Sequence, residues 1–395
     1  MTTMAVIRDP GPSESQSLTF EAFGNAEDFS PIITNIDPTT TPFLSSLTAD
    51  ANAKEPEFSW ITEALRPPIK NAHLEKEDYK TEKVGSLRSL SNNVQIFQNT
   101  GWVSDMQRKT EKIYTEQDEF VRQKQNAFLA HAKDIEYALV TNEARVKGTA
   151  SVPAETGGIP YFLNSSALAA TVATSGLCTT TANHELSTGD FIFFVADTLP
   201  TGLKADVPYY VNVKSSTTFN IYSTMKGAID AVASKQVKPT DAGTNVKVER
   251  NNVVDLGGKA ESTLDDIDSM LYKAQLRGAH PGDLWMNPIN KRRFSKQLLA
   301  NSTNIRKGAE KKLNLVADTY ESDFGIVTAH PHLFYPNDRI DAIDTQYMTL
   351  KWFDHTHEVT GLAKKGNYSE FVIEGSIGLK CTQPQAHGSI TNIKI

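Results

Sequence analysis

The chain has 395 residues, of which 39% are hydrophobic and 22% are charged, with 40 Lys and Arg against 47 Asp and Glu. This composition is typical of a globular protein with more than one lobe and argues against an intrinsically disordered chain. The net charge of −7 argues against a dedicated nucleic-acid binder, which normally presents a basic face.

Cysteines and apolar runs exclude two further classes. Cys178 and Cys381 have no CxxC partner, which argues against a disulfide framework or a zinc ribbon and fits a reducing cytosol. No apolar run approaches the about 20 residues needed to span a bilayer. The first residues lack the basic and apolar regions of a signal peptide, so we expect no membrane association.

The first informative segment is the run 29–47, which reads FSPIITNIDPTTTPFLSSL. Asp37-Pro38 and Thr41-Pro42 bias the residue before each proline away from helix, so we expect the chain to bend and extend here. Apolar residues lie on both sides of this corner: Ile32, Ile33, Ile36, Phe43, Leu44 and Leu47. Residues 1–28 are rich in Ser, Pro and Glu and are expected to be disordered alone and to become ordered most readily when other chains hold them.

Residues 54–104 read as one long hairpin. Phe58 and Trp60 alternate on the outgoing strand, and Val94 and Ile96 alternate on the return strand. The tip between the strands is highly charged and almost free of large apolar residues, so it cannot bury itself in its own domain. It is expected to project into solvent or to lie on a neighbour.

Helical spacing of apolar residues predicts a long helix over Glu111–Val146. Ser104 or Thr115 is the expected N-cap, and Gly148 is expected to end the segment. Such a helix would be about 50 Å long. Its predicted apolar face consists of Ile113, Phe120, Val121, Phe128, Ile135 and Leu139.

Residues 166–248 change in composition to Thr, Ser, Val, Ala and Gly. Strands are predicted at Phe191–Val195, Tyr209–Val213 and Phe219–Tyr222, separated by turns of the STGD and LPTG type. The compositional break at both ends favours a separate β module over a meander of the main sheet.

Residues 249–395 return to mixed α/β structure. A helix with Ser262 as N-cap is predicted to bury Leu264, Ile267, Leu271 and Ala274. A buried strand is predicted at Asp283–Met286, and a turn is predicted at Pro384–Gly388.

Enzyme signatures are absent from the sequence, which contains no phosphate loop, nucleophile elbow or HExxH motif. The pairs His330/His332 and His355/His357 each place two imidazoles on one side of a strand, but nothing fixes a third metal ligand. His184 and His387 are expected to hydrogen-bond the backbone of their turns. No catalytic, cofactor-binding or metal-binding residue is therefore assigned.

The order of these segments, together with the DPTTTPF run at 37–43 and the PQAHG turn at 384–388, resembles the tailed-bacteriophage major capsid proteins. This resemblance implies an α+β fold of the Hong-Kong-97 type (HK97-like). It further implies an N-terminal arm (1–53), an extended loop (54–104) and a spine helix with the first part of a peripheral domain (105–165). An all-β insertion (166–248) would precede an axial domain with the rest of the peripheral domain (249–395).

The resemblance implies a structural protein and no enzyme: a major capsid subunit that assembles into an icosahedral head around viral dsDNA. Its partner would be itself, in hexamers and pentamers, with portal, scaffolding, maturation protease and decoration proteins as further partners. It would be made in the bacterial host cytoplasm and reside in the virion. The residues expected at assembly contacts are Asp37, Pro38, Pro42, Phe43, Glu75, Lys76, Glu77, Asp78, Lys80 and Lys83.

Two other functions compete with this interpretation. The β module also suits a phage tail or receptor-binding protein, but a long helix and a long hairpin argue against that class. The two histidine pairs leave open a metal-dependent enzyme.

Overall fold

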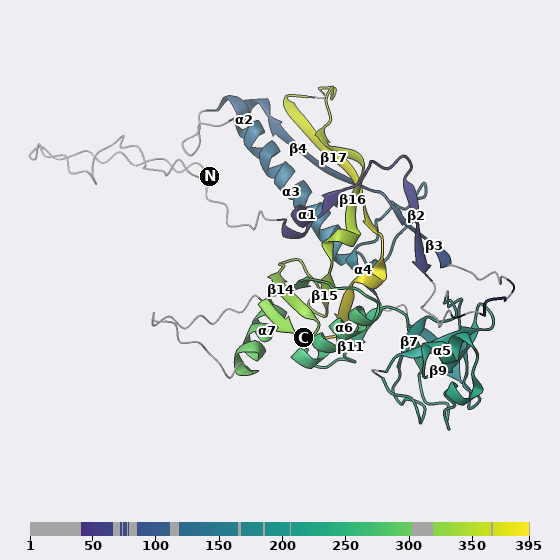
Figure 1. The fold of residues 1–395 in the computed structure, drawn as a ribbon. Helices are drawn as coiled ribbons and strands as arrows, with labels where there is room; N and C mark the ends of the chain where they lie inside the picture. Colours follow the sequence, from purple (N-terminus) through teal and green to yellow (C-terminus); the bar gives the residue numbers. More distant parts are fainter. Residues whose placement is uncertain are drawn as a thin grey trace, which may run out of the picture.

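The computed structural model describes residues 41–65, 72, 74–76, 78, 85–110, 118–164, 167–184, 186–205, 207–301, 319–364 and 366–394. Within these residues Figure 1 shows three bodies: an upper sheet with a long helix, a lower mixed sheet, and a small barrel beside the lower sheet. No helix in the described ranges is long and apolar enough to cross a membrane.

The upper body is a four-stranded sheet with the long helix α3 (Glu119–Thr141) against one face. Its central pair, β16 and β17, is antiparallel, and β4 continues the sheet along β17. Short helices lie around it: α1 (Pro42–Ser46), α2 (Asp105–Lys109) and α4 (Ile159–Leu163). The strands in spatial order are β1 (Thr48–Ala49), β16 (Met348–Glu358), β17 (Tyr368–Cys381) and β4 (Gln95–Ser104).

The lower body is a six-stranded mixed sheet covered by α6 (Leu264–Leu276) and α7 (Pro288–Asn301). The short 3-10 turns η2 (Thr345–Tyr347) and η3 (Pro384–Ala386) lie where the chain leaves this body or returns to it. The strands in spatial order are β11 (Asn252–Asp255), β18 (Gly388–Thr391), β15 (Ile340–Ile343), β12 (Asp283–Met286), β14 (Gly325–Pro331) and β13 (Thr319–Ser322).

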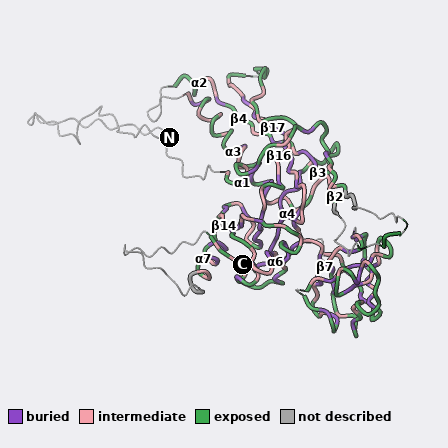
Figure 2. The backbone as a smooth tube through the Cα atoms, in the orientation of Figure 1, coloured by how far each residue is buried: buried purple, intermediate pink, exposed green. Residues whose placement is uncertain are grey.

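The third body is a closed barrel with its own apolar core, including Phe194, Val211, Phe219 and Ile221. Figure 2 shows buried backbone inside it and exposed connections outside. Its strands are β10 (Lys247–Glu249), β5 (Leu168–Val172), β6 (Leu177–Thr180), β9 (Thr218–Tyr222), β8 (Tyr209–Val213) and β7 (Phe191–Val195), with α5 (Met225–Ile229) and η1 (Ala233–Lys235) in the connections.

Several predicted elements are confirmed. The strands at Phe191–Val195, Tyr209–Val213 and Asp283–Met286 have the expected bounds, and the strand expected at Phe219 begins at Thr218. The predicted face of α6 is buried, although Thr263 and not Ser262 is its N-cap. That residues 166–248 form a separately folding insertion stays a prediction.

The long helix is shorter than the predicted span Glu111–Val146. The Asp118 side chain accepts a hydrogen bond from the N–H of Phe120 and so starts α3 at Glu119, while Asn142 is extended and ends it. Ser104 caps the short helix α2 instead, and Thr115 lies outside the described residues. With 23 residues, α3 is about 35 Å long.

A close backbone approach follows the end of α3. A Cβ on Gly158 would lie 2.5 Å from the carbonyl oxygen of Leu139 and 2.8 Å from that of Ala138. Only glycine therefore lets the chain into α4 run this close to the last turn of the helix.

The prediction of a single hairpin over residues 54–104 is wrong in its second strand. β2 (Glu57–Leu65) pairs with β3 (Gly85–Asn93), whereas β4 leaves the hairpin and pairs with β17. Val94 at the junction is buried, but Ile96 is 66% exposed. Only Val94 separates β3 from β4, so the sequence reads as one continuous strand and does not mark the change of partner.

The predicted bend near Pro42 is also only partly right. Thr41 is not helical, as expected before proline, but Pro42–Ser46 forms α1 and does not continue as an extended chain. Proline at the first helical position is favourable because that position needs no N–H donor.

Candidate functional site

The segments assigned to assembly are the arm and the hairpin tip, so the candidate functional site is the set of contacts that holds them on the body. The arm enters the described structure at α1. The side chain of Phe43 in this helix is completely buried. Phe43 packs edge-to-face on Trp285 with ring centroids 5.4 Å apart. Because its side chain lies inside its own subunit, the structure does not support the prediction that Phe43 is an assembly contact. Pro42 is exposed, and Asp37 and Pro38 lie outside the described residues.

A buried carboxylate on α3 anchors the arm. Glu136 accepts hydrogen bonds from the backbone N–H groups of Phe43 (2.8 Å) and Leu44 (2.7 Å), and its side chain is fully buried. Thr41 makes no side-chain cap, so Glu136 serves as the cap of α1 from another element. A negative charge at a helix N-terminus satisfies these donors.

His332 holds the same carboxylate from the lower body. Its Nδ1 accepts from the N–H of Phe334 (3.2 Å), so its Nε2 carries a proton and donates to Glu136 at 2.6 Å. The arm, the spine helix and the end of β14 therefore meet at one buried carboxylate.

Asp50 secures the arm a few residues later. β1 pairs in parallel with β16, and Asp50 then contacts the Nζ of Lys380 (2.7 Å) and of Lys351 (3.4 Å). The hydrogen bond from Lys380, with further help from the Ala51 N–H and from the charge of Lys351, lowers the pKa of Asp50 to about 2 despite partial burial.

We expect Asp50→Asn to lower the free energy of unfolding by about 1 kcal/mol at neutral pH, a modest figure because the cluster is partly hydrated. The folded-state pKa lies below the ordinary value of 3.8, so the stabilisation is complete above pH 4. It is lost as the pH falls through about 2. Urea titrations of parent and variant between pH 7 and pH 2 measure this; a difference that does not shrink on acidification would contradict it.

The base of the hairpin is held by buried asparagines. Asn92 donates from Nδ2 to the carbonyls of Leu379 (2.7 Å) and Gly157 (3.0 Å), and its Oδ1 accepts from the Gly157 N–H (2.8 Å). Asn93 donates to the carbonyl of Val146 at 2.7 Å. Trp60 adds a hydrogen bond to the carbonyl of Cys381, so the hairpin is fixed where it leaves the body.

The hairpin tip is solvent-facing where the structure describes it. Glu75, Lys76 and Asp78 are all exposed, while Glu77, Lys80 and Lys83 lie outside the described residues. The fixed base and exposed tip leave the tip charges available to other molecules, but their role as assembly contacts stays a prediction.

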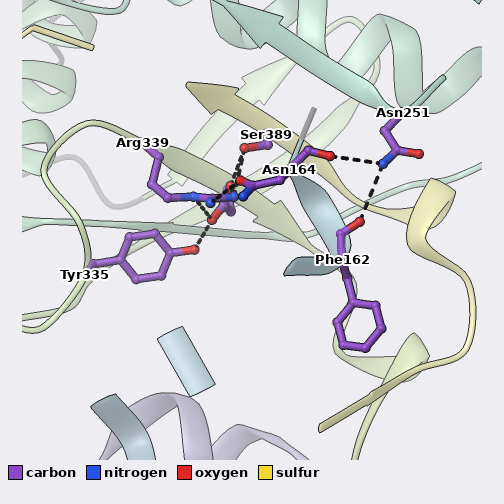
Figure 3. Close-up of polar contacts among 7 residues, drawn as sticks. Phe162, Asn164, Asn251, Tyr335, Arg339 and Ser389 are labelled. Carbon is purple, nitrogen blue, oxygen red and sulfur yellow. Dashed lines mark hydrogen bonds and ion pairs between the residues drawn. The ribbon is translucent and has the colours of Figure 1, made fainter. Parts of the chain in front are cut away.

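A polar network lies where the chain leaves the main body for the barrel (Figure 3). Arg339 donates from Nε and Nη2 to the two carboxylate oxygens of Asp341, both at 2.8 Å, and from Nη1 to the Asn164 Oδ1 at 3.0 Å. Ser389 and the hydroxyl of Tyr335 also donate to Asp341. Burial, with the Asp341 charge nearby, raises the pKa of Tyr335 well above its ordinary value.

The two ends of the barrel segment meet beside this network. Asn251 lies after β10, and its Nδ2 is 3.5 Å from the carbonyl oxygens of Phe162 and Asn164, which precede β5. The two segments that connect the barrel to the body therefore lie side by side.

Lys273 of α6 and Arg277, the C-cap of that helix, contact aromatic rings of β7. The Lys273 Nζ lies 4.9 Å from the ring centroid of Phe193 and donates to the carbonyl of Val253 at 3.1 Å. The Arg277 guanidinium lies 4.3 Å from the ring centroid of Phe191. Cation–π contacts of this kind orient the barrel against the lower body.

The histidines are engaged in structural contacts. His330 stacks on Trp285 and contacts Asp283 at 3.0 Å, and His355 stacks on Trp352. Among the described residues no group of three His, Cys, Asp or Glu side chains has the arrangement to hold a metal ion.

The expectation that the turn histidines bond the backbone of their own turns holds for His184 but not for His387. His184 accepts from the N–H of Leu186 at Nδ1 and contacts the carbonyl of Ser215 through Nε2. His387 accepts from the N–H of Asp344, and its complete burial lowers its pKa to about 3. His184 therefore organises its own turn, whereas His387 ties the 384–388 turn to the backbone just before η2.

A spine helix under a four-stranded sheet, a second mixed sheet, a held arm and a projecting hairpin define the HK97-like fold of phage capsid proteins. The structure is similar to the cyanophage A-1(L) capsid asymmetric unit, with a TM-score of 0.56 and 12% identity over 96% of this chain and 99% of that one. It is also similar to the capsid of a native GTA particle, with a TM-score of 0.54 and 8% identity over 94% and 97% of the two chains.

Sequence similarity gives the family. The family model of the SU10 major capsid protein matches residues 13–394, and the chain belongs to this family. The major capsid protein of Escherichia phage Phieco32 is 25% identical over 384 residues, which are 94% of this chain and 95% of that protein. The chain is thus a structural protein of a bacteriophage capsid.

Proposed function

We propose that this chain assembles as hexamers and pentamers into an icosahedral head that encloses dsDNA, with the arm and hairpin tip lying on neighbouring subunits. The observation that carries this proposal is the contrast between the hairpin base, fixed through the buried Asn92, and the exposed tip charges. A hairpin held this firmly is suited to deliver its tip to another molecule. Many modest contacts of this kind add up in a closed shell.

The accompanying roles follow from this proposal. Portal, scaffolding, maturation protease and decoration proteins would be its partners, and assembly would take place in the host cytoplasm before the subunit becomes part of the virion. Its role would be structural and not catalytic, in line with its membership of the SU10 major capsid protein family. Sedimentation of the purified native chain tests the proposal: megadalton particles support it, and a species that stays monomeric at high concentration opposes it.

The hairpin tip gives a sharper test. We expect the triple variant Glu75→Lys, Glu77→Lys and Asp78→Lys to fold normally and to assemble poorly, with the largest loss at low salt. Each exposed pair contributes only ~0–1 kcal/mol, but a shell repeats the contact many times, and added salt screens the new repulsion. Particle yield against ionic strength measures this effect.

A neutral variant is the matched control for that experiment. Glu75→Gln, Glu77→Gln and Asp78→Asn remove attraction without adding repulsion, so this protein should give an intermediate yield that depends less on salt. Equal yields for all three proteins at every salt concentration would show that the tip makes no contact between subunits.

We further propose that the barrel is an insertion on the outer surface of the shell. Because the Asn251 side-chain Nδ2 lies 3.5 Å from the Asn164 carbonyl oxygen, the two ends of the barrel segment are close together, and a two-glycine linker in place of residues 166–248 should rejoin the chain. We expect this deletion variant to keep the helix and sheets of the main body, as measured by circular dichroism and hydrogen exchange. Loss of protection throughout α3 and β17 would show that the barrel is integral to the fold.

A further inference from the structure

The spine helix carries an exposed apolar stripe. Val121 and Phe128 are each 37% exposed, and Leu129 is 41% exposed, although the sequence pattern places Val121 and Phe128 on the buried face. Figure 2 shows exposed stretches along this part of α3. Large apolar side chains gathered on one helix face are a common sign of a surface that another segment covers.

This stripe lies on the same side of α3 as the arm anchor. At about 100° per residue, Leu129, Phe128 and Val121 fall about 20°, 80° and 60° around the helix from Glu136. These offsets place all three within the width of a single amphipathic face. The face that holds the start of α1 therefore continues, as exposed apolar surface, toward the N-terminal end of α3.

The arm enters at one end of this stripe. Because the N–H groups of Phe43 and Leu44 are bound to Glu136, the chain before Thr41 begins beside that residue. The apolar residues nearest upstream are Ile36, Ile33 and Ile32. Five residues of extended chain reach about 17 Å and nine reach about 30 Å, whereas Leu129 and Val121 lie about 10 Å and about 22 Å along the helix from Glu136.

We propose that residues Ile32–Ile36 of the same chain lie lengthwise on this stripe and cover Val121, Phe128 and Leu129. Ile32, Ile33 and Ile36 are the apolar residues of the arm nearest to the anchor, and the stripe is an exposed apolar surface within their reach. Burying one against the other removes both from water. This inference deepens the role of the arm in the proposed function: residues 1–28 would then leave from the far end of α3 to reach neighbouring subunits.

Other occupants of the stripe are distinguishable. The segment 111–117 contains Ile113 and Tyr114 and joins α3 at its start, nearest to Val121. Phe128 lies ten residues after Asp118, about 15 Å along the helix. A contact at Phe128 therefore distinguishes the arm from the segment 111–117 better than a contact at Val121. The arm of a second copy would meet the same side chains from outside the subunit.

Disulfide trapping tests the proposal, because the native Cys178 and Cys381 are both buried. Ile36→Cys with Phe128→Cys should give a rapid disulfide within one chain under mild oxidation, identified by peptide mass spectrometry and by monomer mobility on a non-reducing gel. The control pair combines Ile36→Cys with Asn126→Cys, which is exposed and about 160° around the helix from Phe128. It should be trapped at least tenfold more slowly.

Two outcomes would overturn the proposal. Disulfide-linked dimers from the first pair would place the arm on a neighbouring subunit. Equal rates of disulfide formation for both pairs would show that the arm does not lie on the stripe. The experiment applies to unassembled subunits as well as to particles, so failure to form shells is separate from failure of the arm to dock.

Hydrogen exchange gives an independent measurement without cysteines. Phe128→Ser with Leu129→Ser should raise amide exchange at residues 32–37 about tenfold while exchange at β17 stays unchanged, whereas Asn126→Ser should change neither. Unchanged exchange at residues 32–37 in the double variant would contradict the docking.

Discussion

Arg339→Met is expected to lower the free energy of unfolding of the subunit by roughly 3–5 kcal/mol, the usual loss when one partner of a buried ion pair is removed. The side chains of Arg339 and Asp341 are 6% and 0% exposed. The guanidinium donates one hydrogen bond to each carboxylate oxygen, so the contact is bidentate. Without the guanidinium, the Asp341 carboxylate keeps only its neutral donors Tyr335 and Ser389. Urea denaturation of the purified subunit measures the loss.

Two variants control this experiment. Lys147→Met removes an ion pair with Glu57 in which the lysine is 79% exposed, so it should change stability by less than about 1 kcal/mol. Adding Asp341→Leu to Arg339→Met removes the stranded charge and should recover part of the loss. An Arg339→Met protein as stable as Lys147→Met would show that the network does not support the junction.

Glu136→Gln is expected to cost roughly 2–3 kcal/mol, in line with the worth of hydrogen bonds to a charged group. The glutamine amide has one acceptor oxygen, whereas the carboxylate accepts from Phe43, Leu44 and His332. At least one N–H at the start of α1 is then left facing an NH₂ group. We therefore expect the amides of Phe43 and Leu44 to exchange faster and the yield of assembled particles to fall.

The matched control for this variant lies on the same helix. Asp134 accepts a hydrogen bond from Asn99 at an exposed position, so Asp134→Asn should cost less than about 1 kcal/mol and leave the exchange of Phe43 unchanged. If Glu136→Gln behaves like Asp134→Asn, the buried carboxylate is not the anchor of the arm.

The sequence predicted the elements that depend on local pattern. Strands such as Phe191–Val195 carry β-branched and aromatic residues between turn signals, and the structure has them at the expected positions. The ends of α3 were wrong because Asp118 and Asn142 set them through backbone hydrogen bonding within a continuing apolar pattern. The switch from hairpin to sheet takes place at the single residue Val94 between β3 and β4, so it has no local signature such as a loop between the two strands.

The anchoring residues were not predicted, because their partners are distant in sequence. Glu136 binds residues 93 positions before it and 196 positions after it. A signal was nonetheless present: Glu136 interrupts the apolar run IEYALV, and a carboxylate in such a run needs buried partners. Asn92-Asn93 at the end of a strand is a similar signal, since adjacent buried amides require several backbone partners.

The central claim is that this subunit forms closed shells, and electron microscopy of the expressed and purified chain tests it most directly. We expect isometric particles of uniform diameter whose averaged images show hexameric and pentameric units, with a small barrel-sized projection on the outside of each subunit. A preparation that stays a uniform monomer at high concentration, folded by circular dichroism and showing no shells or capsomers, would contradict the account.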